Sequence, residues 1–160
     1  HSIDYSYDTD NAIILVDPDH IKVILTNLID NAVKYSSGPS TIDVQLSVTN
    51  DGFILHVKDQ GIGIPRSHIK NIFKKFYRVE DSLSAKTKGH GLGLSIVQGL
   101  MELNKGTVTV KSEWQKGSTF TLFFPEYNVQ PTEINNPTQR DGVAVTSTRE
   151  TSTLASETIV

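Results

Sequence analysis

Apolar residues recur at helical spacing in two stretches of the chain. In the first, Asp17-Pro18 provides a capping carboxylate and a proline at the first helical position, and the periodic run from Ile21 ends at Gly38-Pro39. The second run, Leu92–Asn104, ends before Gly106. Its predicted apolar face consists of Leu92, Ile96, Val97, Leu100, Met101 and Leu103. The pattern therefore predicts two amphipathic helices.

Strict alternation of apolar and polar residues predicts two β-hairpins. Ile42–Val48 and Phe53–Val57 alternate on either side of Asn50-Asp51-Gly52, whose residue types favour a tight turn. Thr107–Lys111 and Ser118–Phe124 form the second pair of predicted strands. The residues expected on one face of the last strand are Phe120, Leu122 and Phe124.

Three further segments complete the folded part of the chain. Ala12–Val16 fits a short buried strand, and Ser67–Arg78 is predicted to be helical. Val79–Lys88 is polar and has no usable period, so a loop is predicted there. Helices that alternate with antiparallel hairpins indicate an α/β (α+β) two-layer sandwich, in which the helices pack on one face of a mixed, mostly antiparallel sheet.

Composition divides the chain near Pro125. Its 160 residues are enough for one domain with a hydrophobic core. We expect that domain to span residues 1–126. Residues 127–160 are rich in Ser, Thr, Asn and Pro, with too few apolar side chains to offset the entropy of ordering the backbone. We therefore expect them to form a flexible Ser/Thr-rich tail.

Charge and residue content exclude several classes of protein. Fifteen Lys and Arg against eighteen Asp and Glu give a net charge of -3, which argues against a protein built to bind nucleic acid. Cysteine is absent, so disulfide scaffolds, thiolate metal sites and cysteine nucleophiles are excluded. No stretch approaches the roughly 18 apolar residues of a membrane span, and we expect no secretory signal.

Two glycine clusters are candidate ligand-binding turns. Gly61 and Gly63 follow a strand that ends at Asp59, and Gly89–Leu94 (GHGLGL) opens the second predicted helix. Glycine lets backbone approach a ligand, and a helix N-terminus presents N–H groups to an anion, so the second cluster could hold phosphate. Its spacing is neither the dinucleotide fingerprint nor a Walker loop. Turns without any ligand are the alternative.

Polar side chains on the first predicted helix suggest a metal–phosphate site. Asn27, Asn31 and Lys34 stand at i, i+4 and i+7, with Tyr35 beside them. Two carboxamides and an ammonium could hold Mg²⁺ and the phosphates that it bridges; the alternative is a solvated polar stripe. Asp59 could accept a hydrogen bond from the amine of adenine and reject guanine, or be an ordinary turn aspartate.

Together these residues resemble the catalytic ATP-binding domain of sensor histidine kinases, within the GHKL superfamily. The resemblance covers residues 1–126 and implies the Bergerat-type ATP-binding fold. Five short motifs carry it in order: Asn27–Tyr35 (the N box), Asp59-x-Gly61-x-Gly63 (the first G box), Phe73–Arg78 (the F box), Gly89–Leu94 (the second G box) and Gly117–Phe120 (the last glycine motif).

The resemblance implies how ATP and Mg²⁺ would be held. Asn31 would bind Mg²⁺ with help from Asn27, while Lys34 and Tyr35 would contact phosphate and ribose. The residues implied to act in catalysis are Asn31, Lys34 and Arg78. The full implied ATP-binding set is Asn27, Asn31, Lys34, Tyr35, Asp59, Gly61, Gly63, Ile64, Lys88, Gly89, His90, Gly91, Leu92, Gly93, Leu94 and Thr119.

The same resemblance implies a base pocket and a lid. Asp59 would bind the adenine amine, with Thr119 at the same base edge, and Gly61 and Gly63 would let backbone approach the base. Residues 79–88 would form a mobile ATP lid. From it, Lys86 or Lys88 would reach the γ-phosphate together with Arg78.

The superfamily also contains gyrase-type, mismatch-repair and chaperone ATPases, which hydrolyse ATP with a glutamate one helical turn before the magnesium-binding asparagine. Here that position is Asn27, which cannot act as a general base, and Asp30 is expected on a different helix face. The resemblance therefore implies a sensor protein histidine kinase with slow ATP hydrolysis. The alternatives are an anti-sigma-type serine kinase and a nucleotide-binding regulatory module without histidine transfer.

Family members phosphorylate a histidine, followed by an acidic residue, on a separate helical domain. None of the five histidines here precedes Asp or Glu, so we expect a catalytic fragment without the acceptor. The implied partners are the dimerisation/phosphoacceptor domain of the same kinase and a downstream response regulator, with no nucleic acid. The fragment alone is expected to be monomeric, and the resemblance implies a cytoplasmic domain of a membrane-anchored bacterial sensor kinase.

Overall fold

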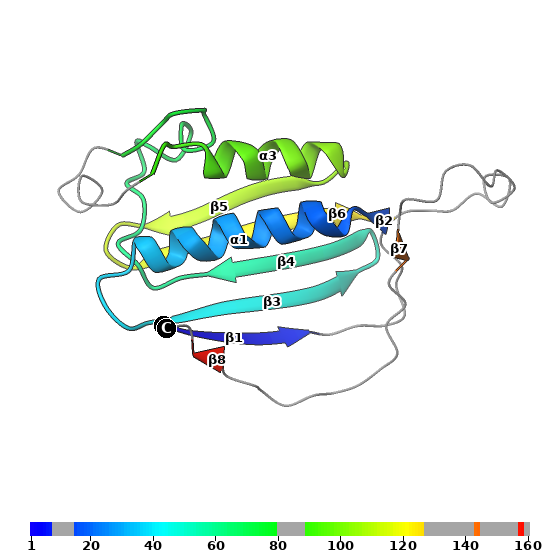
Figure 1. Cartoon of the computed structure of the whole chain (residues 1–160), viewed down its shortest axis with the longest axis horizontal. Helices are drawn as coiled ribbons and strands as arrows, with labels where there is room; N and C mark the ends of the chain where they lie inside the picture. Colours follow the sequence, from blue (N-terminus) through cyan, green and yellow to red (C-terminus); the bar gives the residue numbers. More distant parts are fainter. Residues whose placement is uncertain (8–14, 80–88, 127–142, 145–156, 159–160) are drawn as a thin grey trace, which may run out of the picture.

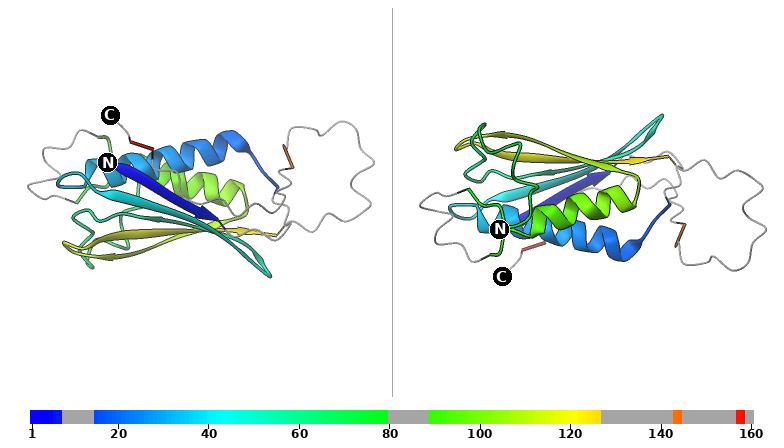
Figure 2. Two further views of the ribbon diagram at one scale, coloured as in Figure 1. Left: turned by 90° about the horizontal axis from the view of Figure 1, so that it is seen from below. Right: turned by 90° about the horizontal axis from the view of Figure 1, so that it is seen from above.

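The computed structural model describes residues 1–7, 15–79, 89–126, 143–144 and 157–158. These residues form two layers, a mixed sheet and two helices that cover one of its faces (Figure 1; Figure 2). The strand order is β5-β6-β4-β3-β1-β8, with β1 parallel to β3 and the other pairs antiparallel. The bounds are β1 Ser2–Tyr7, β3 Thr41–Thr49, β4 Gly52–Lys58, β5 Thr107–Glu113, β6 Gly117–Pro125 and β8 Glu157–Thr158. The predicted fold class is confirmed.

Helix α1, Pro18–Lys34, begins where its capping signal predicts. The Asp17 side chain accepts a hydrogen bond of 2.8 Å from the Asp19 N–H, and Pro18 occupies the first turn. The helix ends at Lys34, with Tyr35 as its C-cap, before the predicted Gly38-Pro39 break. Its buried face consists of Ile24, Leu28 and Ala32.

Helix α3, Gly93–Leu103, packs beside α1 and is also confirmed. Val97 and Met101 are fully buried, but Ile96 is 43% exposed and Leu103 is 71% exposed. The predicted apolar face is therefore only partly buried. Ile96 and Leu103 stand seven residues apart on one side of the helix, rotated about 100° from Val97, and this side turns away from the core.

The two predicted hairpins are confirmed and supply most of the sheet side of the core. Phe120, Leu122 and Phe124 of β6 are all buried, as predicted. In the register of β4 and β6, Val57 pairs with Phe120 and Leu55 with Leu122, so apolar side chains from neighbouring strands meet on one face. The helices bury their apolar faces against this surface.

The segment predicted to be helical, Ser67–Arg78, is instead a chain of turns. His68 donates to the carbonyl of Pro65, Asn71 to that of His68, and Lys74 to that of Asn71, each over three residues. This spacing still directs Ile72 into the core, where it is 7% exposed. Because successive tight turns satisfy the same apolar periodicity, the pattern could not distinguish them from a helix.

The remaining predictions concern the chain ends and the polar loop. Strand β1 was not predicted, although Ile3, Tyr5 and Tyr7 alternate with polar residues along it. Of the predicted strand Ala12–Val16, only Leu15–Val16 lies within the described residues, as β2; residues 80–88 of the predicted loop lie outside them. In the region predicted to be a tail, Val143–Ala144 (β7) pairs with β2, and β8 pairs with β1. The other residues there lie outside the described part.

Candidate functional site

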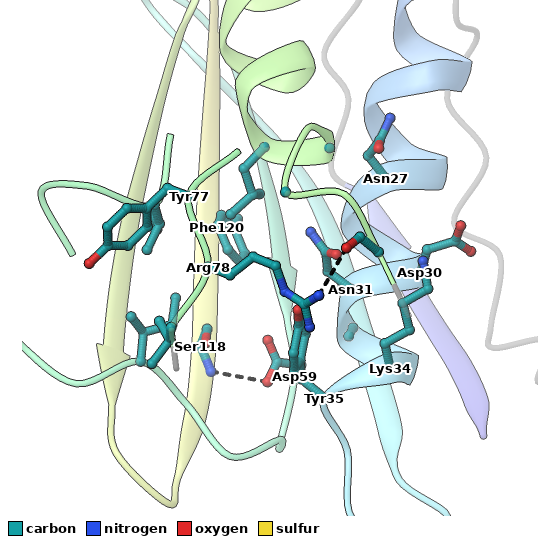
Figure 3. A pocket seen from close by; sticks show the side chains of 18 of the residues that line it. Asn27, Asp30, Asn31, Lys34, Tyr35, Asp59, Tyr77, Arg78, Ser118 and Phe120 are labelled. Atoms are coloured by element: carbon teal, nitrogen blue, oxygen red, sulfur yellow. Dashed lines mark hydrogen bonds between the residues drawn. The ribbon is translucent and has the colours of Figure 1, made fainter. Parts of the chain in front are cut away.

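A cavity of about 360 Å³ opens where α1, the start of α3, the loop after β4 and the β5–β6 turn meet (Figure 3). The structure brings together residues that are far apart in the sequence, including most of the predicted set. The predicted residues that line the cavity are Asn27, Asn31, Lys34, Tyr35, Asp59, Gly63, Ile64, Arg78, Gly89, His90, Gly91, Leu92, Gly93 and Leu94.

Asp59 lies at the end of β4 and is only 9% exposed. Its Oδ1 accepts hydrogen bonds from the backbone N–H groups of Gly61, at 2.8 Å, and Ser118, at 3.2 Å. Its own N–H donates to the Ser118 carbonyl at 2.9 Å. Both backbone donors use Oδ1, so Oδ2 takes neither of these bonds. The carboxylate is thus fixed in orientation at the wall of the cavity.

Burial raises the pKa of the Asp59 carboxyl above its ordinary value of 3.8. Desolvation disfavours the charged form, and this effect outweighs the hydrogen bonds from Gly61 and Ser118, which act in the opposite direction. A buried carboxylate of this kind gains from a further hydrogen-bond donor that enters the cavity.

Asn27 and Asn31 lie on the cavity face of α1, one helical turn apart. The Asn27 side-chain amide donates to the Val23 carbonyl at 2.8 Å, so its Oδ1 is directed toward the start of α3. A Cβ at Gly93 would lie 2.7 Å from this oxygen, so the glycine permits the two helices to approach. Asp30 also lines the cavity, but Figure 3 shows its carboxylate pointing away from Asn31, as the sequence predicts.

The first turn of α3 offers its backbone N–H groups to the cavity. The N-cap residue Leu92 makes no side-chain cap bond, and the first turn contains no acidic residue. Lys34, in the last turn of α1, and Arg78 bring positive charge to the same cavity. Unpaired N–H groups at a helix start together with cations are suited to an anion.

The two described segments on either side of residues 80–88 are tied together beside this helix start. The Arg78 guanidinium donates to the Gly89 carbonyl at 3.0 Å, and the Phe76 N–H donates to the Gly91 carbonyl at 2.9 Å. Gly91 has a φ of +69°, and a Cβ there would lie 2.9 Å from the Tyr77 carbonyl oxygen. Gly91 therefore allows two backbone segments to approach closely.

Two predicted residues do not line the cavity. Thr119 faces the opposite side of the sheet, because side chains alternate along β6 and its neighbour Ser118 faces inward. A Cβ at Gly61 would lie 2.6 Å from the Tyr35 carbonyl oxygen, so this glycine allows the loop to approach α1. Gly61 does not line the cavity. Lys88 lies outside the described residues.

Sequence reasoning missed several residues that line the cavity. For Ser118 the signal was present, because an inward Phe120 requires an inward Ser118 two positions earlier in the strand. The others were not named as site residues, although Ile62, Tyr77 and Phe120 stand within the quoted motifs and Val79 begins the predicted lid; tertiary packing brings them to the cavity. They are Ala32, Ile62, Ile72, Tyr77, Val79, Ile96, Trp114 and Phe120.

Comparison with known proteins decides the family. The family described as "Histidine kinase-, DNA gyrase B-, and HSP90-like ATPase" matches residues 16–128. The chain belongs to this family. The ATPase domain is 41% identical over 125 residues to the signal transduction histidine-protein kinase ArlS of Staphylococcus aureus (strain USA300), a match that covers 76% of this chain. It spans only 28% of the length of that relative.

Solved structures agree with this assignment. The ATPase domain superposes on the mycobacterial sensor histidine kinase MprB with a TM-score of 0.64 and 25% identity, covering 79% of this chain and 84% of that one. Its TM-score with full-length ShkA in complex with AMPPNP is 0.67, with 27% identity, over 81% of this chain and 26% of that one. The predicted family, the catalytic ATP-binding domain of sensor histidine kinases, is therefore confirmed. No helix in the described part of the chain combines the length and apolar character needed to cross a membrane.

Proposed function

We propose that this ATPase domain binds Mg-ATP and presents the γ-phosphoryl group to a histidine on a separate domain of a two-component sensor kinase. The observation that carries the proposal is Asp59, a buried carboxylate fixed at the cavity wall by the N–H groups of Gly61 and Ser118. Adenine would donate its exocyclic amine to this carboxylate. Guanine places a carbonyl oxygen there, so it would leave the carboxylate facing another acceptor.

The phosphates would lie at the other end of the cavity, against the first turn of α3. The first-turn N–H groups that follow Leu92, which makes no side-chain cap bond, and the cations Lys34 and Arg78 support this placement. Phosphoryl transfer depends mainly on positioning and charge neutralisation, which such a site can provide without a base of its own. The acceptor histidine nitrogen would bond to the γ-phosphorus while the bond to the β–γ bridging oxygen breaks, leaving ADP.

The donor set at α1 fits a magnesium ion bound together with phosphate. Asn31 and Asn27 offer side-chain oxygens from one helix face, and Mg²⁺ commonly takes one or two protein ligands and completes its shell with phosphate oxygens and water. The described residues contain no cluster of three His, Asp or Glu side chains that could hold a metal without such help. Bound Mg²⁺ would neutralise phosphate charge.

The residue one helical turn before Asn31 is Asn27, and it favours phosphoryl transfer over ATP hydrolysis. Asn27 uses its amide to bond the Val23 carbonyl and offers no carboxylate that could take a proton from water. The exposed carboxylate of Asp30 points away from Asn31 (Figure 3). We infer that ATP bound here persists until an acceptor histidine arrives.

The acceptor would be supplied by a dimerisation/phosphoacceptor domain of the same kinase, and a response regulator would act downstream. Two histidines illustrate why the chain itself does not provide one. His56 projects from the sheet face opposite the helices and bonds Thr121, and His20 bonds Asn104 at the far end of α1. The chain spans 28% of the length of the histidine-protein kinase ArlS, so a kinase of that length has room for a separate acceptor domain.

The first test is calorimetric titration with ATP and GTP, each with and without Mg²⁺. We expect ATP to bind, more tightly with Mg²⁺, and GTP to bind at least a hundredfold more weakly. Asp59→Asn should abolish the preference for ATP, and Asn31→Ala should remove the Mg²⁺ enhancement. Lys58→Ala, at the exposed end of the same strand, is the matched control and should bind as the unsubstituted chain does. Failure of ATP to bind would overturn the proposal.

A transfer assay then separates the kinase from a nucleotide-binding module. An acceptor domain from a histidine kinase of the same family is added in trans with radiolabelled ATP. Acid-labile, base-stable label on the acceptor is expected for phosphohistidine. Acid-stable label would indicate a serine kinase, and ATP binding without any transfer to the added acceptor domain would indicate the regulatory module.

A further inference from the structure

The chain's single tryptophan, Trp114, lies in the turn between β5 and β6 and lines the cavity. It is 38% exposed, so a residue that lines the cavity is also partly accessible to solvent. A large aromatic side chain left partly exposed beside a cavity has apolar area available to a ligand.

The turn that carries Trp114 is held in place by the loop after β4. The Gln115 N–H donates to the Ile62 carbonyl at 2.7 Å, and the Ile64 N–H donates to Ser112 Oγ, also at 2.7 Å. A Cβ at Gly63 would overlap the Glu113 carbonyl oxygen, so loop and turn are in direct contact. These contacts hold the backbone of Trp114 in place before any ligand binds.

The turn also belongs to the Asp59 end of the cavity. Three residues after Trp114, Gly117 packs directly against the Asp59 carbonyl, and Ser118 follows with its two backbone bonds to Asp59. The start of α3, where an anion would bind, is built from a different part of the chain. Trp114 is therefore positioned to contact a ligand that binds next to Asp59.

We propose that Trp114 forms the outer wall of the base-binding end of this cavity and packs its indole against the bound adenine. This inference rests on the proposed function and adds a base-contacting residue to it. Asp59 would select the base by hydrogen bonding, while Trp114 would cover apolar base surface that otherwise stays in water. Contacts between aromatic side chains and bases tolerate different ring substituents, so Trp114 would add affinity for purines in general.

Because Trp114 is the sole tryptophan, its fluorescence reports this contact directly. The 160-residue chain is titrated with ATP, with adenosine and with inorganic tripolyphosphate, and ATP binding is measured in parallel by calorimetry. ATP and adenosine are expected to change the emission, whereas tripolyphosphate is expected to leave it unchanged. Emission that responds to tripolyphosphate as strongly as to ATP, or that ignores ATP which calorimetry shows to be bound, overturns the inference.

Substitution of Trp114 tests how much this contact contributes to the binding affinity. Trp114→Ala should weaken adenosine and ATP binding about tenfold, and Trp114→Phe should restore most of the affinity, because an aromatic ring is retained. Leu103→Ala, which removes an exposed apolar side chain far from the Asp59 end, is the matched control and should bind normally. Circular dichroism and thermal unfolding of each variant show whether it is folded.

The two failures are distinguishable. If the unsubstituted chain binds ATP and a folded Trp114→Ala variant binds it within twofold as well, the inference is wrong and the proposed function stands. If the unsubstituted chain does not bind ATP in calorimetry, the proposed function is wrong and the inference fails with it.

Discussion

Asp59 and Ser118, 59 residues apart in the sequence, are joined by one backbone–backbone hydrogen bond and one from the Ser118 backbone to the Asp59 side chain. The Asp59 N–H donates to the Ser118 carbonyl at 2.9 Å, and Asp59 Oδ1 accepts from the Ser118 N–H at 3.2 Å. The carboxylate that would read the base is thus oriented by strand β6. A substitution that removes or displaces either residue should alter the relative affinities for different nucleotides while the domain still folds.

Asp59→Asn should exchange the base preference. The Asn oxygen can still accept from Gly61 and Ser118, which would turn the amide NH₂ toward the cavity. A donor there opposes the adenine amine and suits the 6-carbonyl of inosine triphosphate. We expect ATP affinity to fall at least about tenfold and inosine triphosphate to become the preferred ligand, measured by calorimetry. Unchanged preference for ATP would contradict the role given to Asp59.

The raised pKa of Asp59 should be visible in a carboxyl carbon NMR titration. Burial raises this pKa above 3.8, and adenosine should lower it again, because the amine hydrogen bond favours the ionised form. Between 3.8 and the raised value, the native state binds more protons than the unfolded state. The contribution of Asp59 to stability therefore falls as the pH rises through that interval.

The raised pKa of Asp59 should also affect how the free energy of unfolding depends on pH. Urea unfolding of Asp59→Asn, which lacks the titrating carboxyl, should lose this dependence, so the free energy of unfolding of the variant relative to the unsubstituted chain should rise across the interval. A pKa at or below 3.8 in the free protein would contradict the stated balance of burial and hydrogen bonding.

Gly93→Ala and Gly99→Ala form a matched pair on α3. A Cβ at Gly93 would lie 2.7 Å from Asn27 Oδ1, whereas nothing lies within 4 Å of a Cβ at Gly99. Gly93→Ala should displace the Asn27 side chain and reduce the Mg²⁺-dependent part of ATP affinity. Gly99→Ala should raise the free energy of unfolding by about 0.5–1 kcal/mol and leave binding unchanged. Equal effects of both variants on binding would argue against the Asn27 contact.

Gly117→Ala should destabilise the domain and misplace Asp59. Gly117 has a φ of +109°, and a Cβ there would overlap the Asp59 carbonyl oxygen. We expect a loss of about 2 kcal/mol or more in urea unfolding, together with weaker ATP binding. Gly38→Ala has open space around its Cβ and is the control, expected to change stability by less than about 1 kcal/mol.

Ser118→Val and Thr119→Val separate the two faces of β6. Ser118 faces the cavity and is 7% exposed, while Thr119 faces the other side of the sheet. Valine at position 118 should obstruct the base-binding end and abolish measurable ATP binding, whereas valine at position 119 should have no effect. The reverse result would restore Thr119 as the residue beside the base.

Apolar and polar residues alternate along β6, so the sequence predicts that Phe120 faces inward, and the same alternation implies an inward Ser118. The Asp17-Pro18 start of α1 and the Asn50–Gly52 turn were likewise predictable, because caps and turns depend on residues adjacent in sequence. The Ser67–Arg78 segment was not, since consecutive tight turns and a helix share one apolar period.

The family, both helices, both hairpins and most of the cavity residues were predictable from the sequence alone, since they depend on local spacing and short motifs. Three features follow from the folded arrangement instead: Gly61 and Gly91 allow close backbone packing, Ile96 and Leu103 stay exposed, and Trp114 reaches the cavity. Which side of a helix meets its neighbour, and which loops meet across a cleft, depend on contacts between segments far apart in the chain. No local pattern encodes those contacts.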